Sequence, residues 1–111
     1  MVIECSREGS ATVVTVAGRM DALTSPAFEK KLNELIVGGE TRFAVDMAGL
    51  DYISSAGLRG ILAAAKLLKG KGGQISFANV EGAVREVFDI SGFGTIFRIC
   101  DSVAGALAGF K

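Results

Sequence analysis

The chain has 111 residues, half of them hydrophobic, which is the size of one ordinary domain with a single core. Twelve lysine and arginine residues balance twelve aspartate and glutamate residues, so no net charge attracts the chain to nucleic acid or to an anionic membrane. The absence of histidine excludes Ser-His-Asp and Cys-His catalysis and removes the commonest zinc ligand. We therefore expect one domain over residues 1–111 that is not an enzyme and holds no metal or cofactor.

The cysteine spacing and the short apolar runs indicate in which cellular compartment the protein is expected. Cys5 and Cys100 lie far apart without a C-x-x-C spacing, which predicts two reduced, partly buried thiols. The apolar run at residues 61–65 is far too short to span a membrane, and Arg7 and Glu8 are incompatible with a signal peptide. We expect a soluble cytoplasmic protein with no membrane insertion.

The hydrophobic period alternates between two and about three and a half along the chain, which is typical of strands interleaved with helices. Two strand candidates, Val2–Arg7 and Ala11–Ala17, are joined by a turn of three residues. So short a connection predicts an antiparallel hairpin. Ser25-Pro26 then predicts a helix N-cap followed by proline at the first helical position, and Gly38-Gly39 ends that helix.

The remaining predicted elements follow from the same patterns. They are a strand over Thr41–Met47, a helix capped by Ser54 or Ser55 and ended by residues 70–73, a strand over Gln74–Ala78, a helix over Glu81–Ser91, a short strand over Ile96–Cys100 and a helix capped by Asp101 or Ser102. The fold class is thus α/β, with a mixed, mostly parallel sheet of four to five strands, an N-terminal antiparallel hairpin and about four helices.

Parallel strands bring the loops at their carboxyl ends to one edge of the sheet, where ligands and partners usually bind. Three loops qualify here, and we expect their polar residues Asp21, Ser54, Ser55 and Asn79 to line one surface. Asp46, at the end of a central strand, is expected to hydrogen-bond loop amides and not to catalyse.

The adjacent serines stand at a strand-to-helix junction and are followed by the small residues Ala56 and Gly57. A phosphate on such a serine would be stabilised by the helix dipole by about 0.3 to 1 kcal/mol. Position alone favours the simpler interpretation that one of the serines is only the N-cap. Both interpretations stay open on the residues themselves.

Three other glycine-containing segments indicate structural roles. Residues 53–57 lack the first glycine of a nucleophile elbow, and the chain has no histidine to serve it. Residues 70–73 follow a helix and precede a strand, the reverse of the phosphate-loop order. Gly92-Phe93-Gly94 predicts a helix C-cap, with the core favoured over an exposed contact for Phe93.

Three segments together resemble the STAS domain, and specifically the single-domain anti-sigma factor antagonists, also called anti-anti-sigma factors. The segments are Gly18-Arg19-Met20-Asp21 with Ser25-Pro26, residues 43–47 continuing through Tyr52 to Leu58, and Ile90-Ser91-Gly92-Phe93 with Ile96-Phe97. The resemblance covers nearly the whole chain.

In that family the serine two residues before the glycine, or its immediate neighbour, is phosphorylated. The resemblance implies that Gly57 identifies this serine as Ser55, because the neighbouring Ala56 cannot accept phosphate. Ser54 stands where many members have aspartate and is a second candidate. Asp21 matches a family aspartate implicated in partner or kinase recognition.

The function that the resemblance implies is a binding switch. The unmodified domain would sequester an anti-sigma factor that is also a serine kinase of the histidine-kinase-like ATPase type, and so free a sigma factor for transcription. Phosphorylation would break this complex, and a serine phosphatase would restore the unmodified domain. The partner-binding surface implied is Asp21, Ser54, Ser55, Gly57, Leu58, Arg59 and Asn79. The alternative function is a non-phosphorylated docking subunit of a transporter or of a signalling scaffold.

Overall fold

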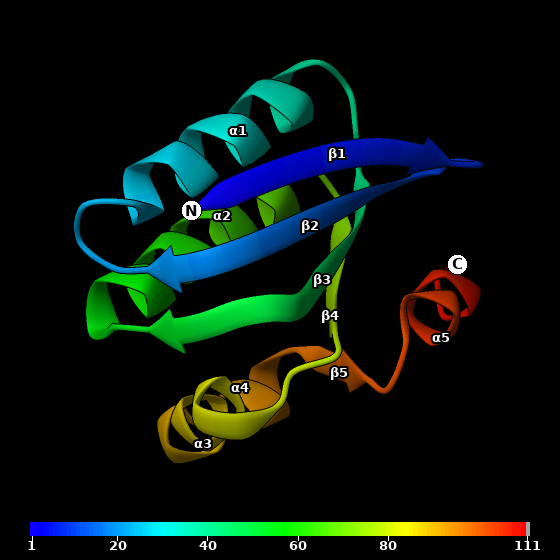
Figure 1. The fold of residues 1–111 in the computed structure, drawn as a ribbon. Coiled ribbons are helices and arrows are strands. Elements are labelled where there is room, and N and C mark those ends of the chain that lie inside the picture. The colour runs from blue at the N-terminus through cyan, green and yellow to red at the C-terminus, as the bar shows by residue number, and fades with distance from the viewer. Residues whose placement is uncertain (111) are drawn as a thin grey trace.

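The computed structural model describes residues 1–110, which form five strands and five helices (Figure 1). In chain order they are β1 (Val2–Glu8), β2 (Ala11–Met20), α1 (Ser25–Val37), β3 (Arg42–Ile53), α2 (Ser55–Gly70), β4 (Gln74–Ala78), α3 (Gly82–Ser91), α4 (Phe93–Ile96), β5 (Arg98–Cys100) and α5 (Val103–Ala108). The strands form one sheet in the order β1-β2-β3-β4-β5. β1 is antiparallel to β2 and the other pairs are parallel, so the predicted α/β fold with its N-terminal hairpin is confirmed.

The two faces of the sheet are covered unequally, as Figure 1 shows. Val14, Val45 and Phe77 face the main core, which is completed by buried residues of α1, α2, α3 and α4. Their neighbours Ala44 and Ala78 face the other side and pack with Ala106 of α5. Because side chains alternate along a strand, the period-two pattern of the sequence separates a large core from a small one.

Four phenylalanines join α3 and α4 to the sheet. The Phe77 ring on β4 contacts Phe88 and Phe97 with centroid distances of 5.6 and 5.2 Å, and Phe93 contacts Phe88 and Phe97 at 5.2 and 5.3 Å. Edge-to-face and tilted contacts of this kind add to the stability gained by burial alone. Phe93 is buried, so its predicted place in the core is confirmed, and Gly92 ends α3 in the left-handed conformation at φ 79°.

The structure corrects four predicted details. α1 is preceded by Thr24 as its N-cap, and Ser25 is a buried residue inside the helix. The last strand begins at Arg98 and not at Ile96, because α4, a fifth helix that the pattern did not predict, buries Phe93 before the chain enters the sheet. Cys5 is exposed on the edge strand β1, whereas Cys100 is half-buried as expected, and both are free thiols.

The fourth correction is the length of β3, which extends to Ile53 and does not end near Met47. The β2–β3 register shifts twice, between Thr15 and Ala17 and between Gly18 and Arg19. Such irregularities break the alternation of side chains, so that the buried residues in this half of β3 are Met47, Leu50 and Ile53, three apart. β3 therefore carries its end loop well beyond the end of β4.

Candidate functional site

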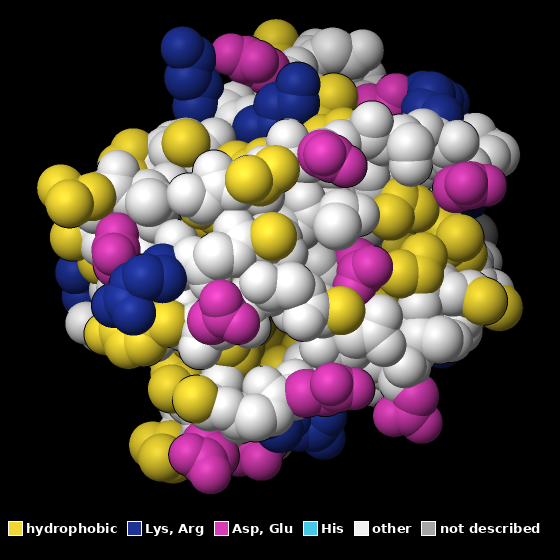
Figure 2. All heavy atoms as spheres, viewed as in Figure 1, with side chains coloured by type: hydrophobic (Ala, Val, Ile, Leu, Met, Phe, Trp, Pro, Cys, Tyr) yellow, Lys and Arg dark blue, Asp and Glu magenta, His cyan; other side chains and the backbone are white. Residues whose placement is uncertain are grey.

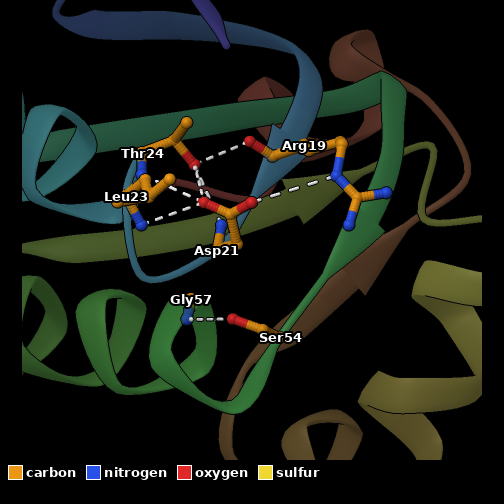
Figure 3. A network of polar contacts seen from close by, with 6 residues as sticks. All are labelled: Arg19, Asp21, Leu23, Thr24, Ser54 and Gly57. Atoms are coloured by element: carbon orange, nitrogen blue, oxygen red, sulfur yellow. Dashed lines mark hydrogen bonds and ion pairs between the residues drawn. The ribbon is translucent and has the colours of Figure 1, made fainter.

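The carboxyl ends of β2 and β3 bring two loops together at one edge of the sheet (Figure 3). Met20 and Ile53 are the last paired residues of these strands, and the Ser54 N–H donates to the Met20 carbonyl oxygen over 2.9 Å. The turn that starts at Asp21 and the serine loop are thereby held side by side. The predicted proximity of Asp21 to Ser54 is confirmed.

Asp21 fixes the turn that leads into α1. Its Oδ1 accepts hydrogen bonds from the backbone N–H groups of Leu23 and Thr24 at 3.0 and 3.1 Å. The Thr24 hydroxyl in return accepts from the Asp21 N–H at 2.9 Å and lies 2.7 Å from the Arg19 carbonyl oxygen. In this reciprocal arrangement, which has the pattern of a capping box but lies in the turn before the N-cap Thr24, aspartate and threonine satisfy each other's backbone.

The Asp21 carboxylate is held in its charged form. Desolvation acts to raise its pKa, but the hydrogen bonds from Leu23 and Thr24 and the charge of Arg19, whose Nε lies 3.9 Å from Oδ2, outweigh it. The net effect is a pKa below the ordinary value of 3.8. Asp21 therefore carries a negative charge beside the serine loop at neutral pH.

We expect the stabilising effect of this charge to depend on pH. Because the folded-state pKa is lowered, the contribution is complete above the ordinary pKa of 3.8 and is lost as the pH falls through the lower folded-state value. Asp21→Asn, which keeps an acceptor oxygen without the charge, should therefore be less stable than the wild type at pH 7, and this difference should shrink in strong acid. Urea unfolding at the two pH values measures it.

The matched control is Asp51→Asn, since Asp51 is exposed near the end of the neighbouring strand and its carboxylate makes no hydrogen bond among residues 1–110. A stability difference between wild type and Asp21→Asn that stayed constant with pH would contradict the electrostatic role of Asp21.

The two serines have different roles in the structure. The Ser54 hydroxyl accepts a hydrogen bond from the Gly57 N–H at 3.2 Å, so Ser54 is the N-cap of α2. Ser55 is the first helical residue; it is exposed, and within the described residues its hydroxyl makes no hydrogen bond. The choice of cap that the sequence left open is settled in favour of Ser54, and Ser55 is left free.

Gly57 allows α2 to begin directly against the end of β2. A Cβ at this position would lie 2.7 Å from the Met20 carbonyl oxygen and 2.8 Å from Ile53 Cγ1, closer than such atoms approach. The next residue, Leu58, is half-buried against the main core, and Arg59 is exposed. The exposed side of this first turn therefore presents Ser55 and Arg59.

The charged side chains on one face of the molecule are of both signs. Figure 2 shows acidic and basic side chains interspersed over the face in view, with small hydrophobic areas between them. In the part of the chain that the structure describes, no group of three or more histidine, cysteine, aspartate or glutamate residues could hold a metal ion. Over the same residues, none of the helices has the length and hydropathy needed to cross a membrane.

The sequence matches the STAS domain family over residues 3–106. The chain belongs to the STAS domain family. BtrV of Bordetella bronchiseptica, which carries the name of an anti-sigma factor antagonist, is 38% identical over 99 residues that cover 89% of this chain and 85% of BtrV. An anti-sigma F factor antagonist of Paenibacillus polymyxa is 29% identical over 106 residues, which cover 95% of this chain and 91% of the relative.

Solved structures share the fold of this STAS domain. The anti-sigma factor antagonist SpoIIAA in its unphosphorylated form superposes with a TM-score of 0.75 at 16% identity, covering 98% of this chain and 100% of SpoIIAA. The phosphorylated form of SpoIIAA from Bacillus gives a TM-score of 0.70 at 20% identity, covering 88% and 90% of the two chains. The relatives and neighbours named here thus all carry the name of SpoIIAA or of an anti-sigma factor antagonist.

Three residues of the STAS domain surface were not among the predicted partner-binding residues. Arg19 and Tyr52 are register partners across β2 and β3, and the Arg19 guanidinium lies 4.1 Å from the centre of the Tyr52 ring. Leu23, at the tip of the Asp21 turn, is 90% exposed. The loops that contain Arg19 and Tyr52 were expected to share one surface, but only the strand register shows that these two side chains are direct partners.

Asn79 occupies a different place from the one predicted. Its side-chain amide donates to Asp46 Oδ1 at 3.0 Å, and that oxygen also accepts from the Ala48 N–H. The predicted structural role of Asp46 is thereby confirmed. Since β3 continues from Asp46 to Ile53, a rise of about 3.3 Å per residue separates Asn79 from Ser54 by on the order of 20 Å along the strand. The expected grouping of Asn79 with the serines is therefore wrong.

Proposed function

We propose that this STAS domain is an anti-sigma factor antagonist controlled by phosphorylation of Ser55. The observation that carries the proposal is the division of roles between the two serines. Ser54 is engaged as the cap of α2, whereas Ser55 presents an exposed hydroxyl at the start of the same helix. A kinase can reach that hydroxyl without breaking a hydrogen bond of the fold.

The partner in this proposal is an anti-sigma factor that is also a serine kinase of the histidine-kinase-like ATPase type. The named relatives support it, since they are antagonists of anti-sigma factors. The exposed Ser55 and Arg59 and the partly exposed Asp21 would contact the partner, while Gly57 and Leu58 would hold the helix in place for it. Binding would release a sigma factor in the cytoplasm, and a serine phosphatase would reverse the phosphorylation.

The switch would act through charge. A phosphoserine brings about −1.5 to −2 charges at neutral pH, and the start of α2 accepts them favourably. The partner surface offers no such stabilisation. An acidic partner surface would repel the phosphate, and an apolar one would remove water from it at a cost in free energy. A coupling free energy of about 1 to 3 kcal/mol between phosphorylation and partner binding changes the affinity about 5- to 150-fold. Such a change suffices for the anti-sigma factor to exchange this domain for its sigma factor.

The test is to phosphorylate the chain with its cognate kinase and ATP and to locate the phosphate by mass spectrometry. We expect phosphate on Ser55 in the wild type and none in Ser55→Ala. The control Ser54→Ala loses a cap and about 0.5 to 2 kcal/mol of stability, yet it should still be phosphorylated below its melting temperature. Phosphate on Ser54 alone would overturn the assignment to Ser55, and phosphate on neither serine would overturn the proposal and favour the non-phosphorylated docking subunit of a transporter or scaffold.

A further inference from the structure

A second surface feature lies toward the other end of α2, away from the serine loop. The second half of α2, the start of β4 and the segment from α4 into β5 enclose a groove of about 540 Å³. With a rise of about 1.5 Å per residue, its Lys66 stands on the order of 15 Å along α2 from Ser55. The groove is therefore separate from the proposed phosphorylation site and independent of the proposed function.

The groove combines apolar walls with charge of one sign. Leu62 and Leu68 of α2 form one wall, Ile75 and Phe97 lie opposite, and Ile96 is 60% exposed at the rim. The charged residues that line it are Lys66, Lys69 and Arg98, and no aspartate or glutamate is among its lining residues. In a chain with zero net charge, this is a local excess of three positive charges over an apolar surface.

The cations of the groove are not neutralised by the fold. Lys66 and Lys69 are three residues apart on α2, where like charges are neighbours and repel each other. Neither lysine has an acidic partner within residues 1–110. Arg98 is held in place by donating to the carbonyl oxygens of Gly105 and Ala106 at 3.1 and 3.3 Å, and no carboxylate of residues 1–110 forms an ion pair with it.

We propose that this groove binds a small anionic amphiphile, with its apolar body along Ile75, Ile96 and Phe97 and its headgroup between Lys66 and Lys69. The volume lies within the roughly 300 to 1,000 Å³ typical of small-ligand sites, and such sites are mostly apolar with a few placed polar groups. A carboxylate or a phosphate monoester would pair with both lysines and relieve their repulsion. The headgroup can belong to a fatty acid or to an alkyl phosphate, which share this chemistry.

The experiment is a titration of the full chain, followed by the backbone amide signals in NMR, with decanoate, decyl phosphate and decan-1-ol. We expect saturable shifts at Lys66, Lys69, Ile75 and Phe97 with one or both anions, and at least tenfold weaker binding of the neutral alcohol. The stronger anion identifies the headgroup class. Equal binding of all three probes, or shifts outside the groove only, would overturn the proposal.

Two variants with matched controls test the headgroup and the apolar body separately. Lys66→Gln combined with Lys69→Gln should weaken binding of the anions at least tenfold, whereas Lys71→Gln, just outside the groove, should not. Ile96→Ser should weaken binding several-fold. Ile90→Ser is the control, because Ile90 is also exposed, at 88%, but does not line the groove, and it should leave binding unchanged. All these side chains are exposed, so each variant should keep the wild-type amide spectrum; unchanged affinity in the lysine variant would contradict the proposal.

Discussion

Ser55→Asp is expected to weaken binding to the anti-sigma factor kinase by about 5- to 150-fold without unfolding the domain. The exposed Ser55 is the first residue of α2, where a negative charge is favoured by the helix dipole. The loss should therefore appear in the affinity and not in the melting temperature. Isothermal titration calorimetry with the purified kinase, beside thermal unfolding of the variant, measures both quantities.

Two controls separate this effect from a general effect of charge. Ser55→Ala should bind with the affinity of the wild type, because the hydroxyl has no partner in the described fold. Ser102→Asp places the same charge at the start of α5, where Ser102 caps the helix on the opposite side of the sheet, and should leave the affinity unchanged. Equal affinity of Ser55→Asp and wild type would place the partner surface elsewhere.

Gly57→Ala is expected to lower the free energy of unfolding by about 1 to 3 kcal/mol. The new methyl group would meet the Met20 carbonyl oxygen at 2.7 Å, and that oxygen cannot move away without breaking its hydrogen bond from the Ser54 N–H. The gain in helix propensity from glycine to alanine, about 1 kcal/mol at most, offsets only part of the strain. Urea denaturation at neutral pH measures the difference.

Gly70→Ala is the matched control at the other end of the same helix. No atom lies within 4 Å of a Cβ built at Gly70, so only the helix propensity changes, and the variant should be as stable as the wild type or slightly more stable. Equal stability of the two glycine variants would contradict the claim that close packing of α2 against the end of β2 requires glycine at position 57.

The sequence predicted the order of the main elements and their faces, because regular strands and helices impose their periods on buried residues. It did not predict the full length of β3. Two register shifts against β2 replace the alternation by a spacing of three between Met47, Leu50 and Ile53. A pattern search by period two ends the strand where the first irregularity begins.

The predicted grouping of three loops at one edge of the sheet was right for two loops and wrong for the third. Ser54 and Ser55 are both good N-cap residues, and the structure makes Ser54 the cap: its backbone is extended, its N–H bonds to Met20, and its hydroxyl accepts from the Gly57 N–H. The prediction for Asn79 assumed that neighbouring strands end at the same level. β4 ends opposite Asp46, so its loop meets the middle of β3 instead of its end.

The reciprocal bonds of Asp21 and Thr24, and the tie between Ser54 and Met20, also bear on how fast and how tightly a partner can dock. They fix the backbone of both loops before any encounter, so a partner meets a preorganised surface and binding does not need to order them. Rigid-body docking is then the natural mode of association. In the proposed switch, a phosphate would act on a surface whose shape is already set, and its free-energy cost would fall on the bound complex and not on the fold.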